Sequence, residues 1–276
     1  MNQKLILIWY RNDLRIHDHE PLHQAVQEKA QIIPLYCFDD RQFGTTSFGF
    51  PKTGAFRAQF LLESVADLRN SLRSLNAADL GKSLGSNLVV RRGLPEQIIP
   101  SLAKELRISA VYYHREVTSE ELAVESALKK ALSQIGVKVK SFWGSTLFHI
   151  NELPFGIRHI PEVFTQFRKQ LEKSSTVYPT FPTPKTLPPL PKVDVGELPK
   201  LADLGLEAPV RDQRAVLQFK GGEAAGLARL DHYFWEKDFL KGYKQTRNGM
   251  LGADYSSKFS PWLALGCLSP RYMKSG

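Results

Sequence analysis

Short apolar runs alternate with amphipathic stretches along the first half of the chain. The runs are rich in aliphatic residues and nearly continuous, which is typical of strands buried on both faces of a parallel sheet. They lie at residues 4–10, 32–38, 88–90, 110–113 and 137–142, and between them the spacing of apolar positions predicts helices over 20–28, 54–75, 96–106 and 119–135. Because strand and helix alternate, we expect a three-layer α/β domain with a Rossmann-like, parallel, five-stranded sheet and right-handed crossovers.

The pattern changes near residue 174. Residues 174–209 hold eight of the 17 prolines and show little periodicity. Since proline fixes φ and lacks a backbone donor, this stretch predicts an extended connector between two domains. We therefore divide the chain into an α/β domain (1–147), a connector (148–210) and the beginning of an all-α domain (211–276).

The last segment contains three expected helices. One opens at Gly221, Gly222 and Glu223 and carries the aromatic residues Tyr233, Phe234 and Trp235, which are expected to pack in the core. Residues 241–254 are rich in Gly, Lys and Arg and predict a loop. Two further helices follow this loop.

Composition narrows the class of protein. Hydrophobic residues make up 42% and charged residues 24%, and no apolar run is long enough to span a bilayer. The N-terminus shows no signal-like cleavage site, so we expect a soluble, cytoplasmic protein without a membrane partner. Cys37 and Cys267 lie in different predicted domains and are expected to be buried, reduced thiols. His17 and His19 have no third ligand at a suitable spacing, so we expect loop histidines, hydrogen-bonded or solvated, and no metal site.

The net charge of +9 fits a polyanionic partner, and its distribution is uneven. Residues 211–276 hold 11 lysines and arginines against six acidic residues, a net of +5, which leaves +4 over the other 210 residues. The basic excess is therefore denser at the C-terminal end.

Two Ser-Pro pairs, Ser260-Pro261 and Ser269-Pro270, each place a preferred capping residue before the residue best tolerated at a first helical position. Ser256, Ser257 and Lys258 precede the first pair, so hydroxyls, a cation and free backbone N–H groups would converge there. Such a group of donors suits a phosphate or pyrophosphate. The alternative is a capped helix without a ligand.

Loops at the carboxyl ends of the predicted strands are the usual ligand-binding positions of such a sheet. The first of these, RNDLRIHDHE, carries no glycine-rich dinucleotide motif and is dense in charge. It is either part of a ligand site or a salt-bridged surface loop.

Several motifs occur in one order along the chain. They are WYRNDLRIHDHEPL, KTGAFRAQFL, GLPEQIIP, YYHREVTSEEL, FWGSTL, FKGGEAAGLARL and GADYSSKFSPWLALGCLSPR, and they extend from Trp9 to Arg271. This series of motifs resembles the photolyase/cryptochrome family. The motif sequences are most similar to those of the DASH cryptochromes, which act as photolyases on single-stranded DNA.

The resemblance implies a cofactor, a reaction and a set of residues. It implies FAD in a helical domain and blue-light-driven repair of cyclobutane pyrimidine dimers, or a closely related photoreceptor function. The residues that match the flavin contacts of the family are Tyr243, Ser256, Ser257, Lys258, Phe259 and Ser260. Arg247 matches a DNA-contacting arginine, and a guanidinium is well shaped to bind a phosphate.

The family also carries a light-harvesting antenna, commonly a folate such as 5,10-methenyltetrahydrofolate. Glu116 and Glu120 are the candidate antenna contacts.

The chain ends inside a predicted helix, whereas the family continues with the rest of the flavin pocket. We therefore assign no catalytic residue. We expect residues up to about 147 to fold on their own, and the part beyond 211 to be loosely ordered, to bind FAD weakly or not at all and to lack repair activity. Two alternatives remain open: the chain pairs with a separately encoded C-terminal half, or it is a non-enzymatic nucleotide-binding α/β module or antenna-domain fragment.

Overall fold

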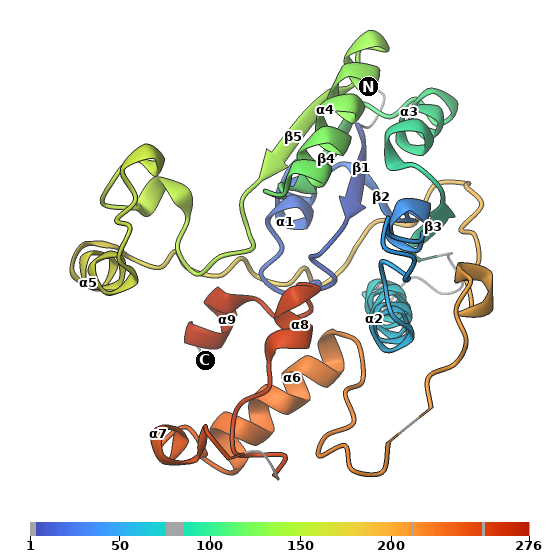
Figure 1. Cartoon of the computed structure of the whole chain (residues 1–276). Helices are drawn as coiled ribbons and strands as arrows, with labels where there is room; N and C mark the ends of the chain where they lie inside the picture. Colours follow the sequence, from blue (N-terminus) through green and yellow to red (C-terminus); the bar gives the residue numbers. More distant parts are fainter. Residues whose placement is uncertain (1–3, 76–84, 211, 250–251, 276) are drawn as a thin grey trace.

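Five parallel strands form the centre of the computed structural model, which describes residues 4–75, 85–210, 212–249 and 252–275 (Figure 1). Their order across the sheet is β3-β2-β1-β4-β5. The strands are β1 (Leu5–Tyr10), β2 (Gln31–Phe38), β3 (Val89–Arg92), β4 (Ala110–His114) and β5 (Lys138–Phe142). The predicted Rossmann-like sheet is confirmed, and each predicted strand lies within a few residues of an observed one.

Helices cover both faces of the sheet. They are α1 (Glu20–Gln27), α2 (Ala55–Ser74), α3 (Pro95–Glu105) and α4 (Ser119–Gln134). Alternate residues of β1 enter two separate cores: Ile6 and Ile8 pack with α1 and α2, whereas Leu5 and Leu7 pack with α3 and α4. Because both faces of the sheet are covered, β1 is buried along its whole length, as its continuous apolar run predicts.

The chain between the sheet and the last helices has one element that the apolar pattern did not predict. This is α5 (Phe164–Ser174), which follows two short 3₁₀ turns, η2 (Ile150–Glu152) and η3 (Ile157–His159), and stands away from the sheet in Figure 1. Residues 175–201 then run without helix or strand, and a further turn, η4 (Ala202–Leu204), follows. The N–H of Val90 donates to the carbonyl of Val195 (2.8 Å), so this stretch covers the free edge of β3.

The C-terminal segment is helical. It contains α6 (Glu223–Asp231), which continues as the π-helical turn η5 (His232–Glu236), then α7 (Tyr243–Thr246), α8 (Ser260–Ala264) and α9 (Pro270–Ser275). The short helix α7 lies inside the stretch expected to be a loop, so that expectation is wrong there. None of the described helices is both long and apolar enough to cross a membrane. The domain limits at 147 and 210 stay predictions, and residue 211 lies outside the described part of the chain.

The helical segment shares a hydrophobic core with the α/β domain. Phe60 of α2 meets Trp262 of α8 edge to face at 5.9 Å, and Leu265 and Leu268 are buried in the same cluster as β1. Tyr233 is also buried, as expected. Trp235 is 57% exposed, so the expectation that it packs in the core is wrong. This shared core weighs against the expectation that the segment beyond 211 is loosely ordered. Cys37 and Cys267 are free and buried, as predicted.

Candidate functional site

The charged loop after β1 is buried beneath the helical segment. The N–H of Leu14 donates to the carbonyl of Leu265 (3.1 Å), and the guanidinium of Arg15 donates to the carbonyl of Gly266 (2.9 Å). The carboxylate of Glu223, the first residue of α6, accepts from the backbone N–H groups of Ile16 (2.9 Å) and His17 (3.1 Å). The alternative of a salt-bridged surface loop is therefore wrong, because residues more than 200 positions away cover this loop.

A second set of contacts joins the end of the same loop to α9. The guanidinium of Arg271 donates to both carboxylate oxygens of Asp18, at 2.6 and 3.0 Å. The hydroxyl of Ser269 also donates to Asp18 and accepts from the N–H of Tyr272 (3.4 Å), so Ser269 caps α9 as predicted. Loop 11–19 thus binds the helical segment at α6, at the turn after α8 and at the start of α9.

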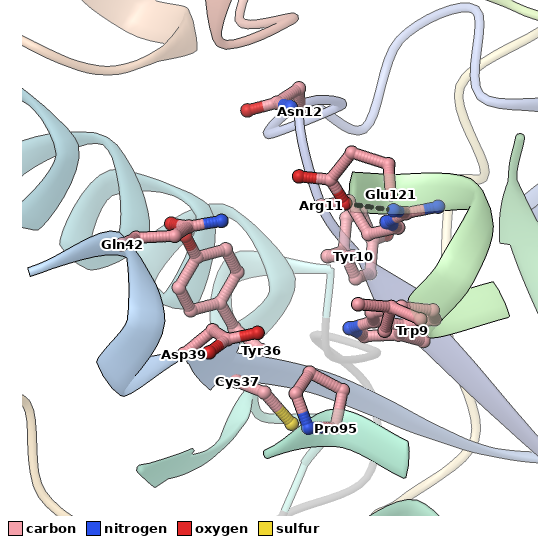
Figure 2. Close-up of a pocket in the computed structure, with 11 residues that line it drawn as sticks. Trp9, Tyr10, Arg11, Asn12, Tyr36, Cys37, Asp39, Gln42, Pro95 and Glu121 are labelled. Carbon is pink, nitrogen blue, oxygen red and sulfur yellow. Dashed lines mark hydrogen bonds and ion pairs between the residues drawn. The ribbon is translucent and has the colours of Figure 1, made fainter. Parts of the chain in front are cut away.

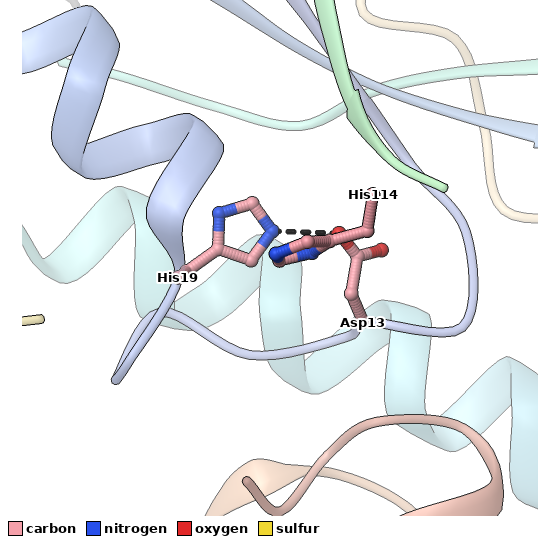
Figure 3. A group of neighbouring side chains, drawn as sticks. All are labelled: Asp13, His19 and His114. Atoms are coloured by element: carbon pink, nitrogen blue, oxygen red, sulfur yellow. Dashed lines mark hydrogen bonds and ion pairs between the residues drawn. The ribbon is translucent and has the colours of Figure 1, made fainter. Parts of the chain in front are cut away.

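Asp13, His19 and His114 form a buried cluster at the carboxyl ends of β1 and β4 (Figure 3). Oδ2 of Asp13 accepts from Nε2 of His19 (2.8 Å) and from Nδ1 of His114 (2.7 Å), while Oδ1 accepts from the N–H of Arg11 (2.6 Å). Burial alone would raise the pKa of Asp13, but the two histidine hydrogen bonds hold it well below its ordinary range. Burial lowers the pKa of His114 to about 4, so its ring is neutral at pH 7.

The three side chains are of types that can bind a metal ion, and their possible ligand atoms lie within 4.8 Å of one another. Nδ1 of His19, however, accepts the N–H of Leu22 (3.1 Å) and therefore carries no proton, so Nε2 bears the proton that Asp13 accepts. A metal bound through Nε2 would need the opposite tautomer and would break this helix cap. The arrangement thus favours a hydrogen-bonded cluster. His17 and His19 are buried, so the solvated alternative for these two residues is wrong.

A small cavity lies between the carboxyl ends of β1 and β2 (Figure 2). Arg11 stands over the ring of Trp9 (4.4 Å) and donates to Glu125 (2.6 Å) and to Glu121, which lines the cavity opposite Asp39. The cavity measures about 30 Å³, which is room for about one water molecule. In this arrangement the crevice cannot hold a folate or a flavin.

The two candidate antenna residues have different surroundings. Glu116 is half-buried, accepts from the amide of Asn12 (3.1 Å) and has its pKa raised by burial. Glu120 is exposed and forms an ion pair with Lys52. A Cβ added to Gly266 would lie 2.1 Å from the carbonyl oxygen of Asn12, so the Glu116 side chain lies near the boundary of the α/β domain with the helical segment.

The predicted phosphate-binding residues lie on the loop between α7 and α8. Ser256, Ser257 and Lys258 are half-buried, and Nζ of Lys258 donates to the carbonyl of Gly252 (3.0 Å). Phe259 is buried against Tyr233 and Phe234, so only its backbone faces the loop.

The predicted cap of α8 is absent. Ser260 is the first residue of that helix, and the N-cap position, occupied by Phe259, makes no side-chain hydrogen bond. The prediction that Ser260 caps α8 is therefore wrong, although its hydroxyl remains exposed beside the loop.

Tyr243 and Arg247 lie on and directly after α7. Tyr243 is 36% exposed, and Arg247 is exposed. Within the described ranges, no acidic side chain pairs with the guanidinium of Arg247, which leaves it available to an external anion.

Two residues that organise these sites were missed from the sequence. Arg229 is buried on α6 and donates to the loop that carries Ser256 and Ser257, and Glu223 holds loop 11–19. The only sequence signal was a charged side chain in a predicted helix that is otherwise largely apolar. The partners of Arg229 and Glu223 lie far away in the sequence, so no local pattern predicts these contacts.

The model of a protein family described as DNA photolyase matches residues 6–189 of this sequence. The chain belongs to the DNA photolyase family. The motifs that suggested this resemblance extend through both sides of the interface described above.

Named relatives within the family are similar along the whole chain. A cryptochrome DASH from Gloeobacter violaceus is 65% identical over 273 residues, which are 99% of this chain and 53% of that relative. The solved cryptochrome of Synechocystis sp. superposes with a TM-score of 0.91 at 50% identity, covering 100% of this chain and 55% of that one. A class III photolyase from Agrobacterium tumefaciens gives a TM-score of 0.79 at 28% identity, over 99% and 52%. The chain thus spans about half the length of these family members.

A flavin phosphate is chemically compatible with the loop 252–260. The loop offers the hydroxyls of Ser256 and Ser257 and the ammonium of Lys258. In the described part of the chain, the N–H groups of Ser257 and Lys258 have no acceptor. Hydroxyl, ammonium and backbone N–H donors are the groups that bind phosphates in other proteins. The donor set therefore fits the diphosphate of FAD.

Proposed function

We propose that this chain supplies the antenna domain and the first part of the flavin domain of a blue-light-driven enzyme that repairs cyclobutane pyrimidine dimers in single-stranded DNA. The observation that carries the proposal is the loop 252–260, whose donors fit a diphosphate within a chain of the DNA photolyase family. When bound and reduced, FAD supplies the excited electron that splits the dimer. The remaining steps belong to binding and orientation by the protein.

Ser256, Ser257, Lys258 and Ser260 would hold the phosphates, and the backbone of Phe259 would complete the loop. Tyr243 would contact the cofactor from α7. Because Phe259 is fixed by Tyr233 and Phe234, the loop is anchored in the core at the residue next to Lys258. A ligand therefore meets a preformed site, which lowers the entropic cost of binding.

DNA binding would use the exposed side of α7. Arg247, directly after α7, would contact a backbone phosphate, aided by the exposed Lys244 on α7. A damaged, poorly stacked dinucleotide is easier to extrude into a pocket than an intact pair, and in single-stranded DNA no base pair has to be broken.

A folate antenna would lie near Glu116, at the boundary of the two segments. The carboxylate of Glu116 is half-buried and has one amide partner, so it retains acceptor capacity for the N–H groups of a pterin ring. Glu120, which is occupied by Lys52, would contact only the periphery of such a ligand.

The decisive test combines this chain with the C-terminal part of a longer relative, which this chain does not span. We would co-express it with the C-terminal half of the Gloeobacter violaceus relative, purify the complex and measure bound flavin after denaturation. We expect a yellow complex that splits thymine dimers in a single-stranded oligonucleotide under blue light and not in the dark. A colourless complex that FAD cannot reconstitute would overturn the proposal, and a flavin-bound complex without dimer splitting would favour photoreception over repair.

A further inference from the structure

The buried guanidinium of Arg229 is surrounded by the loop that carries the proposed phosphate site. Nε donates to the carbonyl of Ser257 (3.1 Å), and Nη2 donates to the carbonyls of Ala253 (3.0 Å) and Ser256 (3.3 Å). Nη1 donates to the carboxylate of Asp254 (2.6 Å). One side chain on α6 therefore binds four residues of a loop that lies 24–28 positions further along the chain.

These bonds determine which way the peptide groups of the loop face. In a trans peptide the C=O and the following N–H point in opposite directions. Because the carbonyls of Ser256 and Ser257 point to Arg229, the N–H groups of Ser257 and Lys258 point away from it. Lys258 adopts a positive φ of 56°, and Phe259 follows in the right-handed region at φ −75°. Such a reversal turns successive N–H groups toward one side, as in anion-binding nests.

The charge of Arg229 is already neutralised by Asp254, whose oxygen Oδ1 also lies 3.4 Å from Nε2 of His232. The ring of Tyr233, whose centroid lies 5.3 Å from the guanidinium carbon of Arg229, also holds the Arg229 side chain in place. The contribution of Arg229 is therefore geometric: its planar fork matches several carbonyls at once, which a lysine cannot do.

We infer that Arg229 is a positioning residue that shapes loop 252–260 into a phosphate cradle by holding the carbonyls of Ala253, Ser256 and Ser257 inward. This inference rests on the proposed function, because it assumes that the cradle receives the phosphates of the flavin. It predicts that loss of the guanidinium fork weakens phosphate binding by this loop even when the helix and its charge are retained.

Inorganic pyrophosphate is the probe, titrated into the ¹⁵N-labelled 276-residue chain while the amide signals of Ser257 and Lys258 are followed. The variants are Arg229→Lys, which keeps the charge, and Arg229→Met, which keeps the apolar stem. The matched control is Arg271→Lys, which removes the guanidinium fork of an equally buried arginine that pairs with Asp18 outside the loop. Thermal unfolding of each variant reports general destabilisation separately.

We expect the dissociation constant for pyrophosphate to rise about tenfold in Arg229→Lys and further in Arg229→Met, since charge-assisted hydrogen bonds that shape the site are lost. Arg271→Lys should lower the unfolding temperature and leave this constant within about twofold of the parent. Equal affinities in the parent and both Arg229 variants, or an equal loss in Arg271→Lys, would overturn the positioning role. If the parent amides do not respond to pyrophosphate, the cradle itself, and with it the proposed flavin site, is refuted.

Discussion

Replacing Glu223 by glutamine tests how the helical segment is attached to the α/β domain. The carboxylate of Glu223 accepts two backbone N–H groups of loop 11–19, at 2.9 and 3.1 Å, and it also accepts a hydrogen bond from Nδ1 of His17. Glutamine keeps one acceptor and presents an NH₂ donor to a second N–H, which leaves a buried donor unpaired. We expect a loss of about 3 kcal/mol, which is the usual cost of removing one partner of a buried, hydrogen-bonded charge.

The loss should be local to the interface. Hydrogen exchange of amides at 262–268 should become about a hundredfold faster, because each 1.4 kcal/mol changes an opening equilibrium tenfold. Amides of β1 and β4 should keep their protection. Glu207→Gln, at an exposed position on the connector, is the control and should change neither region. Unchanged protection of residues 262–268 in Glu223→Gln, or an equal loss in the sheet, would show that this carboxylate does not hold the segment.

Three further predictions follow from individual side chains. Gly144→Ala should destabilise the fold by about 2 kcal/mol, since its Cβ would lie 2.3 Å from Nε2 of His114; Gly44→Ala, whose nearest atoms are 3.8 Å away, should be neutral in the same urea titration. Stability should fall as pH drops from 6.5 toward about 4, by up to about 3 kcal/mol, because the unfolded chain protonates His114 in that window while the folded chain does not; a flat stability profile would contradict this. In the co-expressed complex, Arg247→Ala should lower the slope of log affinity for single-stranded DNA against log salt by about one, whereas Arg214→Ala, which removes an arginine already paired with Asp212, should leave it unchanged.

The parallel sheet was predictable because its signal is local. Each strand is a continuous apolar run, and each crossover helix repeats apolar residues at helical spacing, so a window of a dozen residues contains the information. The order of the strands then follows from short, right-handed connections. Even the second start of a helix, at Ser269-Pro270, was predictable, since a cap acts within one turn.

The interface was not predictable in this way. Loop 11–19 is dense in charge, which by itself is typical of a solvated surface, and its burial depends on Glu223 and Arg271, far along the chain. The role of Arg229 was equally unpredictable, because the sequence of a helix does not show which distant carbonyls an arginine on it binds. Helix α5 was missed for a different reason: its apolar stripe consists of only three residues, Phe164, Phe167 and Leu171, and the other positions of this short helix are polar, so its signal is weak.

The burial of loop 11–19 also bears on where an antenna would bind. In open α/β sheets the crevice at the carboxyl ends of the strands is the usual ligand site. Here Arg11 and its carboxylate partners leave a cavity of about 30 Å³ in that crevice, and the helical segment covers the neighbouring part of the edge. A folate-sized ligand does not fit that cavity, and the candidate contact Glu116 lies beside the covered edge, where it accepts from Asn12, whose backbone packs against Gly266. Antenna affinity should accordingly depend on docking of the helical segment, so that a change which loosens the interface weakens antenna binding without touching an antenna contact.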